Sequence, residues 1–123
     1  LHRLVAQTRT AAMDTTLHYE IKGAVYALST EVESNLLRMG QEALTNAIRH
    51  AHADEIRVEL TYDRDQFCLR VKDNGQGFGV GSIPASEGFG LLGMSERAER
   101  IGAQLTIQSQ PGRGTEIVVV IGV

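Results

Sequence analysis

The stretch Asp73-Asn74-Gly75-Gln76-Gly77-Phe78 decides how this 123-residue sequence is interpreted as a fold. Two further glycine clusters follow it, Gly88-Phe89-Gly90-Leu91-Leu92-Gly93-Met94 and Gly112-Arg113-Gly114-Thr115. Glycine lacks a Cβ, so these segments can adopt positive φ and let the backbone approach a ligand closely. One cluster alone would indicate a turn. Three in succession, preceded by a long helix with a polar stripe, indicate the wall of a nucleotide pocket.

The residues before this stretch alternate between apolar and polar side chains, in runs 56–62 and 67–71. This pattern predicts two half-buried strands joined by a hairpin. Asp73 has the same parity as the apolar members of the second run, so its carboxylate should face the apolar side of the sheet. A buried carboxylate is costly unless it is paired, and the exocyclic amine of a purine would satisfy it. The alternative is a turn in which Asp73 bonds the nearby backbone.

A long helix running to about residue 50 is predicted by the capping-box pattern of Thr30 and Glu33. At 100° per residue, its apolar residues share one arc, while Glu42 and Asn46 share a polar stripe. The amide oxygen of Asn46, if it lies beside phosphates, is a hard ligand suited to Mg²⁺. Glu42 could orient or deprotonate the group that attacks a γ-phosphate. The alternative is an ordinary solvated face.

The second glycine cluster is expected to lie at the start of a helix over residues 91–101. Unpaired backbone N–H groups and a partial positive charge at such a start favour phosphate. Gly88 and Gly90 would therefore lie beside the phosphates, with Arg49 and His50 as further candidate contacts. The alternative is a helix entry in which glycine only allows close packing. A dinucleotide-binding fold is rejected, because a loop and not a strand precedes the cluster.

The third cluster, Gly112-Arg113-Gly114-Thr115, is first of all the turn of a hairpin. Its functional role would be to pack behind the pocket or to place Thr115 near the nucleotide.

The rest of the chain predicts an α/β (α+β) two-layer sandwich, with a mixed, mostly antiparallel sheet of about five strands covered on one face by about three helices. Residues 1–14 are expected to be the remnant of an upstream helix or linker, and residues 15–123 to be one domain. The further expected elements are two short strands or a strand and a turn over 16–27, a loop over 79–89, a helix end at Gly102, and strands from Leu105 and Thr115.

Composition excludes several classes of protein. A net charge of −3 and a pI of about 5.8 argue against a nucleic-acid partner. The lone Cys68 excludes an internal disulfide, and His50 and His52 lack a third ligand for zinc. No apolar run of 18 residues and no signal peptide occur, so no direct membrane contact is expected of this domain. Because the sequence starts without methionine, we expect a fragment of a longer cytoplasmic protein, including the case of the cytoplasmic part of a membrane-bound sensor.

Taken in order, these motifs resemble the ATP-binding catalytic domain of bacterial two-component sensor histidine kinases. The stretch from Gln41 to Ala51 resembles the N box of that family, the first glycine cluster its G1 box and the second its G2 box. The motif Gly-Leu-Leu-Gly-Met, followed by Glu96-Arg97, is similar to that of the nitrate-sensor-like subclass. The resemblance covers about residues 15–123.

The resemblance implies a Bergerat-type (GHKL) fold that binds Mg-ATP between the long helix and a short lid over about 79–87. It implies that Glu42 is the catalytic acid–base residue, Asn46 the Mg²⁺ ligand and Asp73 the acceptor of the adenine amine. Arg49 stands where the subclass often has lysine, which keeps the charge and changes its geometry. The remaining nucleotide-binding residues it implies are His50, Gly75, Gly77, Phe78, Gly88, Phe89, Gly90, Leu91, Gly93, Met94 and Thr115.

The resemblance also implies partners that lie outside this sequence. The phosphoacceptor histidine of the family is carried by a separate dimerising hairpin, and neither His2 nor His18 matches it. We therefore expect ATP binding, transfer to a histidine supplied elsewhere, and a response regulator served through the full-length protein. The alternatives are an ATPase of the same fold, an anti-sigma serine kinase and a non-catalytic nucleotide sensor.

Overall fold

The computed structural model describes residues 15–50, 53–76 and 85–123, with the backbone alone at 49–50 and 85–90. Residues 1–14 lie outside this part. Of the predicted lid over 79–87, residues 79–84 also lie outside it, whereas residues 85–87 belong to a helix and not to a loop. The described elements follow one another as β1 (Thr16–Gly23), α2 (Thr30–Thr45), a π-helical turn (Asn46–His50), β2 (Glu55–Tyr62), β3 (Gln66–Asp73), α3 (Ala85–Arg100), β4 (Gln104–Gln110) and β5 (Gly114–Gly122).

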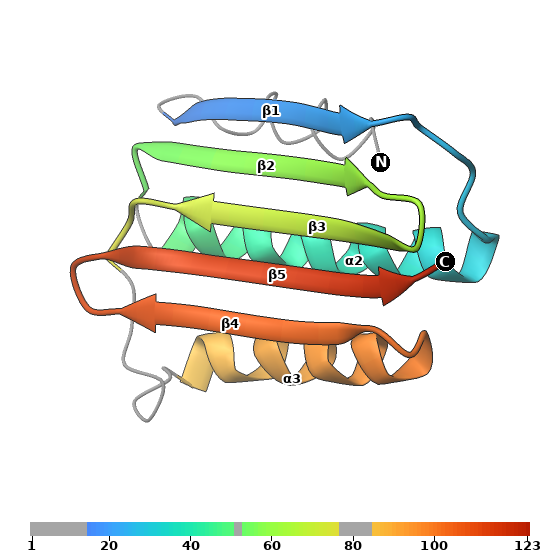
Figure 1. Cartoon of the computed structure of the whole chain (residues 1–123). Coiled ribbons are helices and arrows are strands. Elements are labelled where there is room, and N and C mark those ends of the chain that lie inside the picture. Colours follow the sequence, from blue (N-terminus) through green and yellow to red (C-terminus); the bar gives the residue numbers. More distant parts are fainter. Residues whose placement is uncertain (1–14, 51–52, 77–84) are drawn as a thin grey trace.

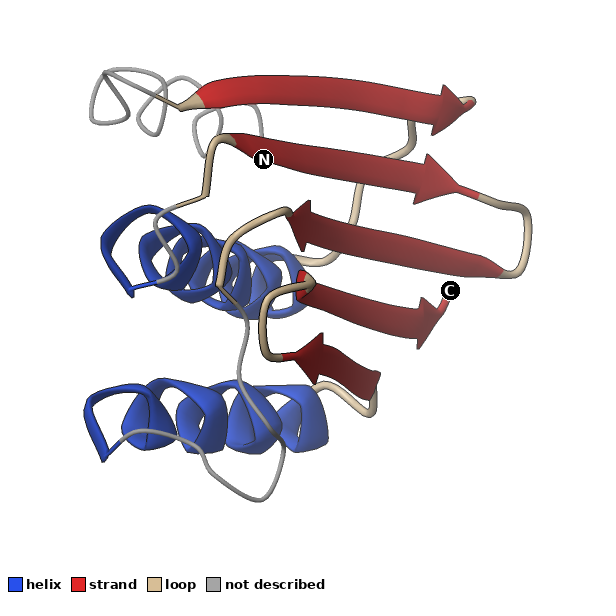
Figure 2. Ribbon diagram, turned by 90° about the vertical axis from the view of Figure 1, so that its left-hand side faces the viewer, coloured by secondary structure: helices blue, strands red, loops and turns tan. Residues whose placement is uncertain are grey.

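The five strands form one mixed sheet in the order β1-β2-β3-β5-β4 (Figure 1). β1 pairs with β2 in parallel, and the other three pairs are antiparallel. Both described helices lie on the same face of the sheet (Figure 2). The predicted two-layer α+β sandwich is therefore confirmed, with two of its approximately three expected helices in the described part.

The helix face of the sheet forms the core because the strands alternate strictly. In β3 the buried positions are Phe67, Leu69, Val71 and Asp73, which is every second residue. Alternate side chains of a strand point to opposite faces, so one apolar face packs against both helices. The largest fully buried side chains are Phe67, Leu36, Met39, Leu44, Ile56, Leu60, Leu69, Met94, Val58 and Val119.

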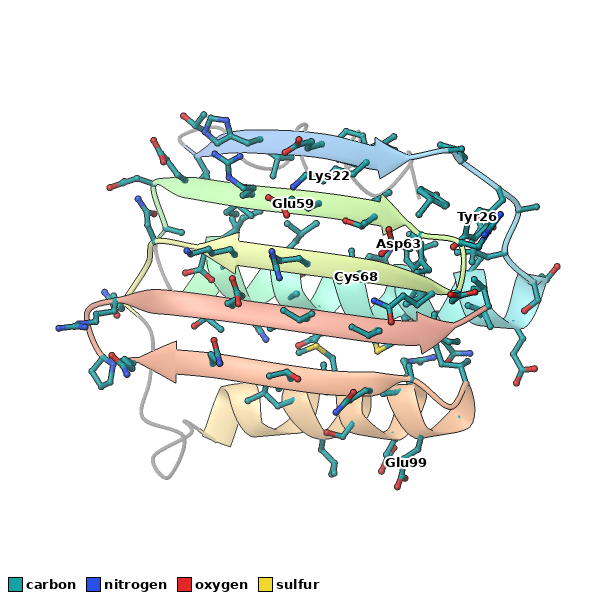
Figure 3. The ribbon with its side chains drawn as sticks, viewed as in Figure 1. Lys22, Tyr26, Glu59, Asp63, Cys68 and Glu99 are labelled. Atoms are coloured by element: carbon teal, nitrogen blue, oxygen red, sulfur yellow. The ribbon has the colours of Figure 1, made fainter. Side chains whose placement is uncertain are left out.

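Neither described helix covers the opposite face of the sheet, called the open face below, which carries charged side chains (Figure 3). Arg70 lies 3.5 Å from Glu59 and 3.9 Å from Glu116, and Lys22 lies 3.9 Å from Glu59. Cys68 lies half-buried on the same face, and burial raises the pKa of its thiol. Neither described helix has the length and apolar character needed to cross a bilayer.

The N-cap of the first helix lies one residue before the predicted one. Ser29 is the N-cap, and its hydroxyl accepts a hydrogen bond from the backbone N–H of Val32 at 3.3 Å. The predicted capping box at Thr30 is wrong, because Thr30 is already the first helical residue. The predicted end near His50 is confirmed, with a change of pitch at Asn46.

The second described helix begins six residues before its predicted start. α3 runs from Ala85 rather than Leu91, so Gly88 and Gly90 lie inside the helix. Glycine has low helix propensity and hid this start, although Pro84-Ala85-Ser86 is a helix-start pattern. The predicted end is confirmed. Gly102 has φ +67° and donates to Glu99 O, and Ala103 donates to Ala98 O, which is a Schellman motif.

Of the two interpretations of residues 16–27, the structure has the strand followed by a non-strand segment. Tyr26 lies in that segment, and its hydroxyl donates to the carbonyl oxygens of Asp63 (2.7 Å) and Gln66 (3.1 Å). These bonds fasten the segment to the β2–β3 hairpin at the side of the molecule where α2 begins (Figure 3).

Candidate functional site

The candidate site lies where five element ends meet. β3 and β4 finish, β5 begins, α2 finishes and α3 begins at the same side of the molecule, on the left in Figure 1. The first glycine cluster follows the end of β3, and the third cluster lies between β4 and β5. Segments that are far apart in the sequence are thus brought together between the helices and the end of the sheet.

Asp73 is buried at this end, with 7% of its surface exposed. The parity prediction is therefore confirmed. One carboxylate oxygen accepts a hydrogen bond from the backbone N–H of Gly75 at 2.8 Å, so the turn interaction named as the alternative also occurs. Burial raises the pKa of the Asp73 carboxyl, and bonds from the backbone N–H groups of Gly75 and Thr115 lower it in part. The net direction is upward, so the protein backbone alone does not fully compensate the buried charge.

Thr115 lies directly opposite Asp73 in the pairing of β5 with β3, and opposite Ser109 in the pairing of β5 with β4. Gly114, which precedes it, has φ +83°, and a Cβ on it would lie 2.1 Å from the carbonyl oxygen of Asp73. Only glycine fits a backbone approach this close. The third cluster therefore packs against the Asp73 strand end, as one of its two predicted roles requires.

Three hydrogen bonds that the sequence did not predict hold the first cluster in place. The side-chain oxygen of Asn74 accepts from the backbone N–H groups of Asp54 and Glu55, both at 2.9 Å. Gly112 donates its backbone N–H to the carbonyl oxygen of Gln76. The loop after Asp73 is thus tied to β2 on one side and to the β4–β5 turn on the other.

Glu42 and Asn46 are half-buried at the end of α2. The backbone N–H of Asn46 is shared between the carbonyl oxygens of Glu42 and Ala43, so Asn46 follows Glu42 by one turn. At Asn46 the helix widens into the π-helical turn, and Ala53 closes it by donating to Ala47 O at 3.2 Å. Such turns occur often at functional sites, and helical periodicity did not reveal this one.

A shallow cavity of about 630 Å³ opens at the end of the sheet. Asp73, Ser109, Arg113, Gly114 and Thr115 are among its lining residues. Within the described part of the chain, no group of three His, Cys, Asp or Glu side chains is arranged to hold a metal ion.

The other predicted site residues divide into three groups. Leu91 and Met94 are buried in the core (7% and 1% exposed) on α3, and Gly93 is half-buried beside them. Gly88 and Gly90 lie in the first two turns of α3, so the backbone N–H groups at the helix start belong to residues from Ala85 onward. Outside the described residues, or with undescribed side chains, are Arg49, His50, Gly77, Phe78 and Phe89.

Comparisons with known proteins bear on this arrangement. Residues 31–123 match the family model described as histidine kinase-, DNA gyrase B-, and HSP90-like ATPase. The signal transduction histidine-protein kinase/phosphatase DegS of Bacillus subtilis is 36% identical over 107 residues, covering 84% of this chain and 28% of that protein. The sensor histidine kinase LiaS of the same organism is 43% identical over 93 residues, covering 76% and 26%.

Among solved structures, the histidine kinase domain of the blue-light activated kinase EL346 from Erythrobacter litoralis has a TM-score of 0.80 at 20% identity. The match covers 98% of this chain and 58% of that one, and it shows a common fold. This chain spans less than a third of the length of the two curated relatives named above.

Proposed function

The chain belongs to the family of histidine kinase-, DNA gyrase B- and HSP90-like ATPases, and we propose that it is the ATP-binding catalytic domain of a bacterial sensor histidine kinase. Both curated relatives named above are histidine kinases by name, one of signal transduction and one a sensor, which confirms the family resemblance inferred from the sequence. The observation that carries the proposal is the buried carboxylate of Asp73 at the point where the element ends meet.

On the adenine side, we propose that Asp73 accepts a hydrogen bond from the exocyclic amine of the base. Backbone N–H groups compensate this buried, ionised carboxylate only in part. A further hydrogen-bond donor would therefore stabilise it. Gly75 is buried beside it and holds one carboxylate oxygen, while Gly77 and Phe78 extend the same loop in sequence. The first turn of α3, which ends at Gly88, would then face the phosphates through its unpaired backbone N–H groups.

On the phosphate side, we propose that Asn46 is the protein ligand of Mg²⁺ and that Glu42 handles the proton of the attacking imidazole. The fit rests on the half-buried amide of Asn46, one turn after a half-buried carboxylate at the polar end of α2. A cation that keeps most of its waters needs few protein groups, so a single amide oxygen suffices. When bound, Mg²⁺ would neutralise charge on the transferring phosphoryl group.

The other half of the reaction is supplied elsewhere. We propose that the acceptor is a histidine on a separate dimerisation domain of the same kinase, and that a response regulator then takes the phosphoryl group from the full-length protein. We propose that the reaction takes place in the cytoplasm, where ATP is available, whether or not the full-length sensor is anchored in a membrane.

The test mixes the 123-residue chain with the separately produced helical hairpin of its kinase and γ-labelled ATP. Acid-labile phosphohistidine on the hairpin is the expected product. Glu42→Gln should lower the rate of transfer by at least about 100-fold, the size of a general acid–base contribution, while ATP affinity changes by less than about threefold. Glu99→Gln, at an exposed position of α3, is the matched control and should leave the rate unchanged.

Other outcomes identify the alternatives. Phosphoserine on a partner protein would indicate an anti-sigma kinase, and rapid ATP hydrolysis by the chain alone would indicate an ATPase. ATP binding without transfer to any acceptor would indicate a nucleotide sensor. Absence of ATP binding would contradict the proposal as a whole.

A further inference from the structure

A pair of hydroxyl groups lies behind Asp73 at the end of the sheet. Ser109, on β4, is 9% exposed, and its Oγ lies 2.8 Å from Oγ1 of Thr115 on β5. The same Oγ lies 3.3 Å from the carbonyl oxygen of Gly114. The two strands pair here, with Ser109 opposite Thr115. The contacts are therefore set by the backbone ladder and by the close approach of Gly114 to Asp73.

The donors and acceptors of this group can be assigned by counting hydrogens. Each hydroxyl has one hydrogen and two lone pairs, and the carbonyl oxygen of Gly114 can only accept. Both contacts are hydrogen bonds only when Ser109 donates to Gly114 and Thr115 donates to Ser109. The single hydrogen of Thr115 then points toward Ser109, and both lone pairs of its oxygen are left as acceptors.

This assignment matters because Thr115 lies directly opposite Asp73 in the sheet. Both residues belong to the helix face of the sheet, and both line the same cavity. An ionised carboxylate is also only an acceptor. The end of the sheet thus presents two adjacent acceptor groups, which match an exocyclic amine with two N–H donors. A base that carries a carbonyl oxygen at that position would place a third acceptor opposite the carboxylate of Asp73 and the hydroxyl oxygen of Thr115, so neither could hydrogen-bond to it.

We propose that Ser109 is a specificity-determining positioning residue, which holds the Thr115 hydroxyl as an acceptor and thereby makes the site select adenine over guanine nucleotides. The inference rests on the proposed nucleotide-binding function of this site. It assigns a role to a β4 residue that the sequence analysis did not single out. Ser109 acts through Thr115 and need not touch the nucleotide.

The test measures dissociation constants of Mg-ATP and Mg-GTP for the chain by titration calorimetry. In Ser109→Ala, the Thr115 hydroxyl can rotate and donate, so the preference for ATP over GTP should fall by about 3- to 10-fold, the value of one neutral hydrogen bond. Thr106→Val removes a hydroxyl from the exposed face of the same strand and should leave the preference unchanged. Ser109→Thr keeps the hydroxyl and should restore the preference.

A second variant covers the case in which Ser109→Ala does not fold. Thr115→Val removes the acceptor itself and should weaken ATP binding more than GTP binding, whereas Thr115→Ser should keep the preference. In the Thr115→Val background, Ser109→Ala should have no further effect on the preference, because the two residues act as one unit.

Any of four results would overturn the proposal. If Ser109→Ala weakens both nucleotides equally, the residue is merely structural. If Thr115→Val leaves the preference intact, the hydroxyl takes no part in base selection. A wild-type chain that binds neither nucleotide would overturn the proposed function together with this inference, whereas an unchanged preference in tight-binding variants would overturn the inference alone.

Discussion

Strand β3 has two ends of opposite character. Phe67, near its start, is fully buried, and its ring lies edge-to-face with Tyr62 at 4.9 Å, which in turn lies edge-to-face with Tyr26 at 5.1 Å. Asp73, at its finish, is nearly as well buried but carries a carboxylate in place of a ring.

The two ends have opposite effects on the stability of the fold. Burying an aromatic side chain stabilises the fold, whereas burying a carboxylate raises its pKa and costs stability at neutral pH. Proteins commonly accept such a cost at functional sites. The aromatic end should therefore control folding, and the Asp73 end should control nucleotide binding.

The largest effect is expected from Phe67→Ala at the aromatic end. Removing a fully buried ring should lower the free energy of unfolding by about 3–5 kcal/mol, because it leaves a cavity and removes the edge-to-face neighbour of Tyr62. Urea denaturation followed by circular dichroism measures this loss. At low temperature, where the variant is folded, its ATP affinity should equal that of the wild type.

The matched control is Val120→Ala, which truncates the open face of the sheet opposite Cys68, next to the pairing of Phe67. Its loss of stability should be clearly smaller. If Phe67→Ala weakened ATP binding in the folded protein by tenfold or more, the separation of the two ends would be wrong.

Asp73→Asn should have the reverse effects. ATP affinity should fall by about 10- to 100-fold, the range expected when a hydrogen bond to a charged group is lost. Thermal stability at pH 7 should rise, because the buried charge is removed. Titration calorimetry and thermal unfolding of the same samples give both quantities. A variant that binds ATP normally would remove Asp73 from the adenine site.

The stability gain of Asp73→Asn should depend on pH in a defined direction. The folded-state pKa of Asp73 lies above its ordinary value of 3.8, so the folded protein binds this proton more tightly than the unfolded chain. The contribution of Asp73 to wild-type stability therefore falls as the pH rises from the ordinary pKa of this carboxyl to its folded-state pKa. The difference in stability between variant and wild type should disappear below about pH 4 and should reach its full size above the folded-state pKa of Asp73. A gap independent of pH would mean that the carboxylate charge is not its cause.

Much of this comparison could be predicted from the sequence. Alternation in residues 56–62 and 67–71 gave the strands, and parity placed Asp73 on the helix face. Both depend on neighbours along one strand. The pairing of Ser109 with Thr115 and the bonds from Asp54 and Glu55 to Asn74 depend on register between distant segments, which no local pattern contains.

The helix boundaries show a different limit of sequence analysis. Ser29 and Thr30 are both good N-cap residues, and the glutamate three residues after Thr30 favoured the wrong one. At α3, Gly88 and Gly90 lowered the local helix propensity, while the structure continues the helix through them from Ala85. Packing of Leu91 and Met94 against the core outweighs that propensity.

A smaller effect is expected from Ser29→Ala, at the end of α2 far from the site. Loss of the N-cap bond to Val32 should lower the free energy of unfolding by about 1 kcal/mol. Thr30→Ala should cost less, since Thr30 is not the cap. Chemical denaturation of both variants ranks them, and an equal or larger cost for Thr30→Ala would favour the capping box instead. ATP affinity should not change in either.

The smallest effect is expected on the open face, which belongs to neither end. Glu59→Gln removes the contacts with Arg70 and Lys22, whose side chains are 44% and 50% exposed. Exposed pairs of this kind contribute about 0.5 kcal/mol, and salt screens them. Denaturation at low and at about 1 M salt should show a small difference that disappears at the higher concentration. A large, salt-independent loss would show that this face contributes to stability as the aromatic end does.

The opposite directions of α2 and α3 have an electrostatic consequence for the site. α2 finishes there and α3 begins there (Figure 1), so the site faces the carbonyl end of one helix and the N–H end of the other. Two antiparallel helix dipoles set up a field across the gap, with its negative pole at the end of the helical segment that continues through Asn46–His50 and its positive pole at the start of α3. A cation bound next to a phosphate chain would match this field, with the cation at the negative pole and the phosphates at the positive pole. Because this field arises from the backbone, it does not titrate, and it persists in every variant described above that keeps its fold.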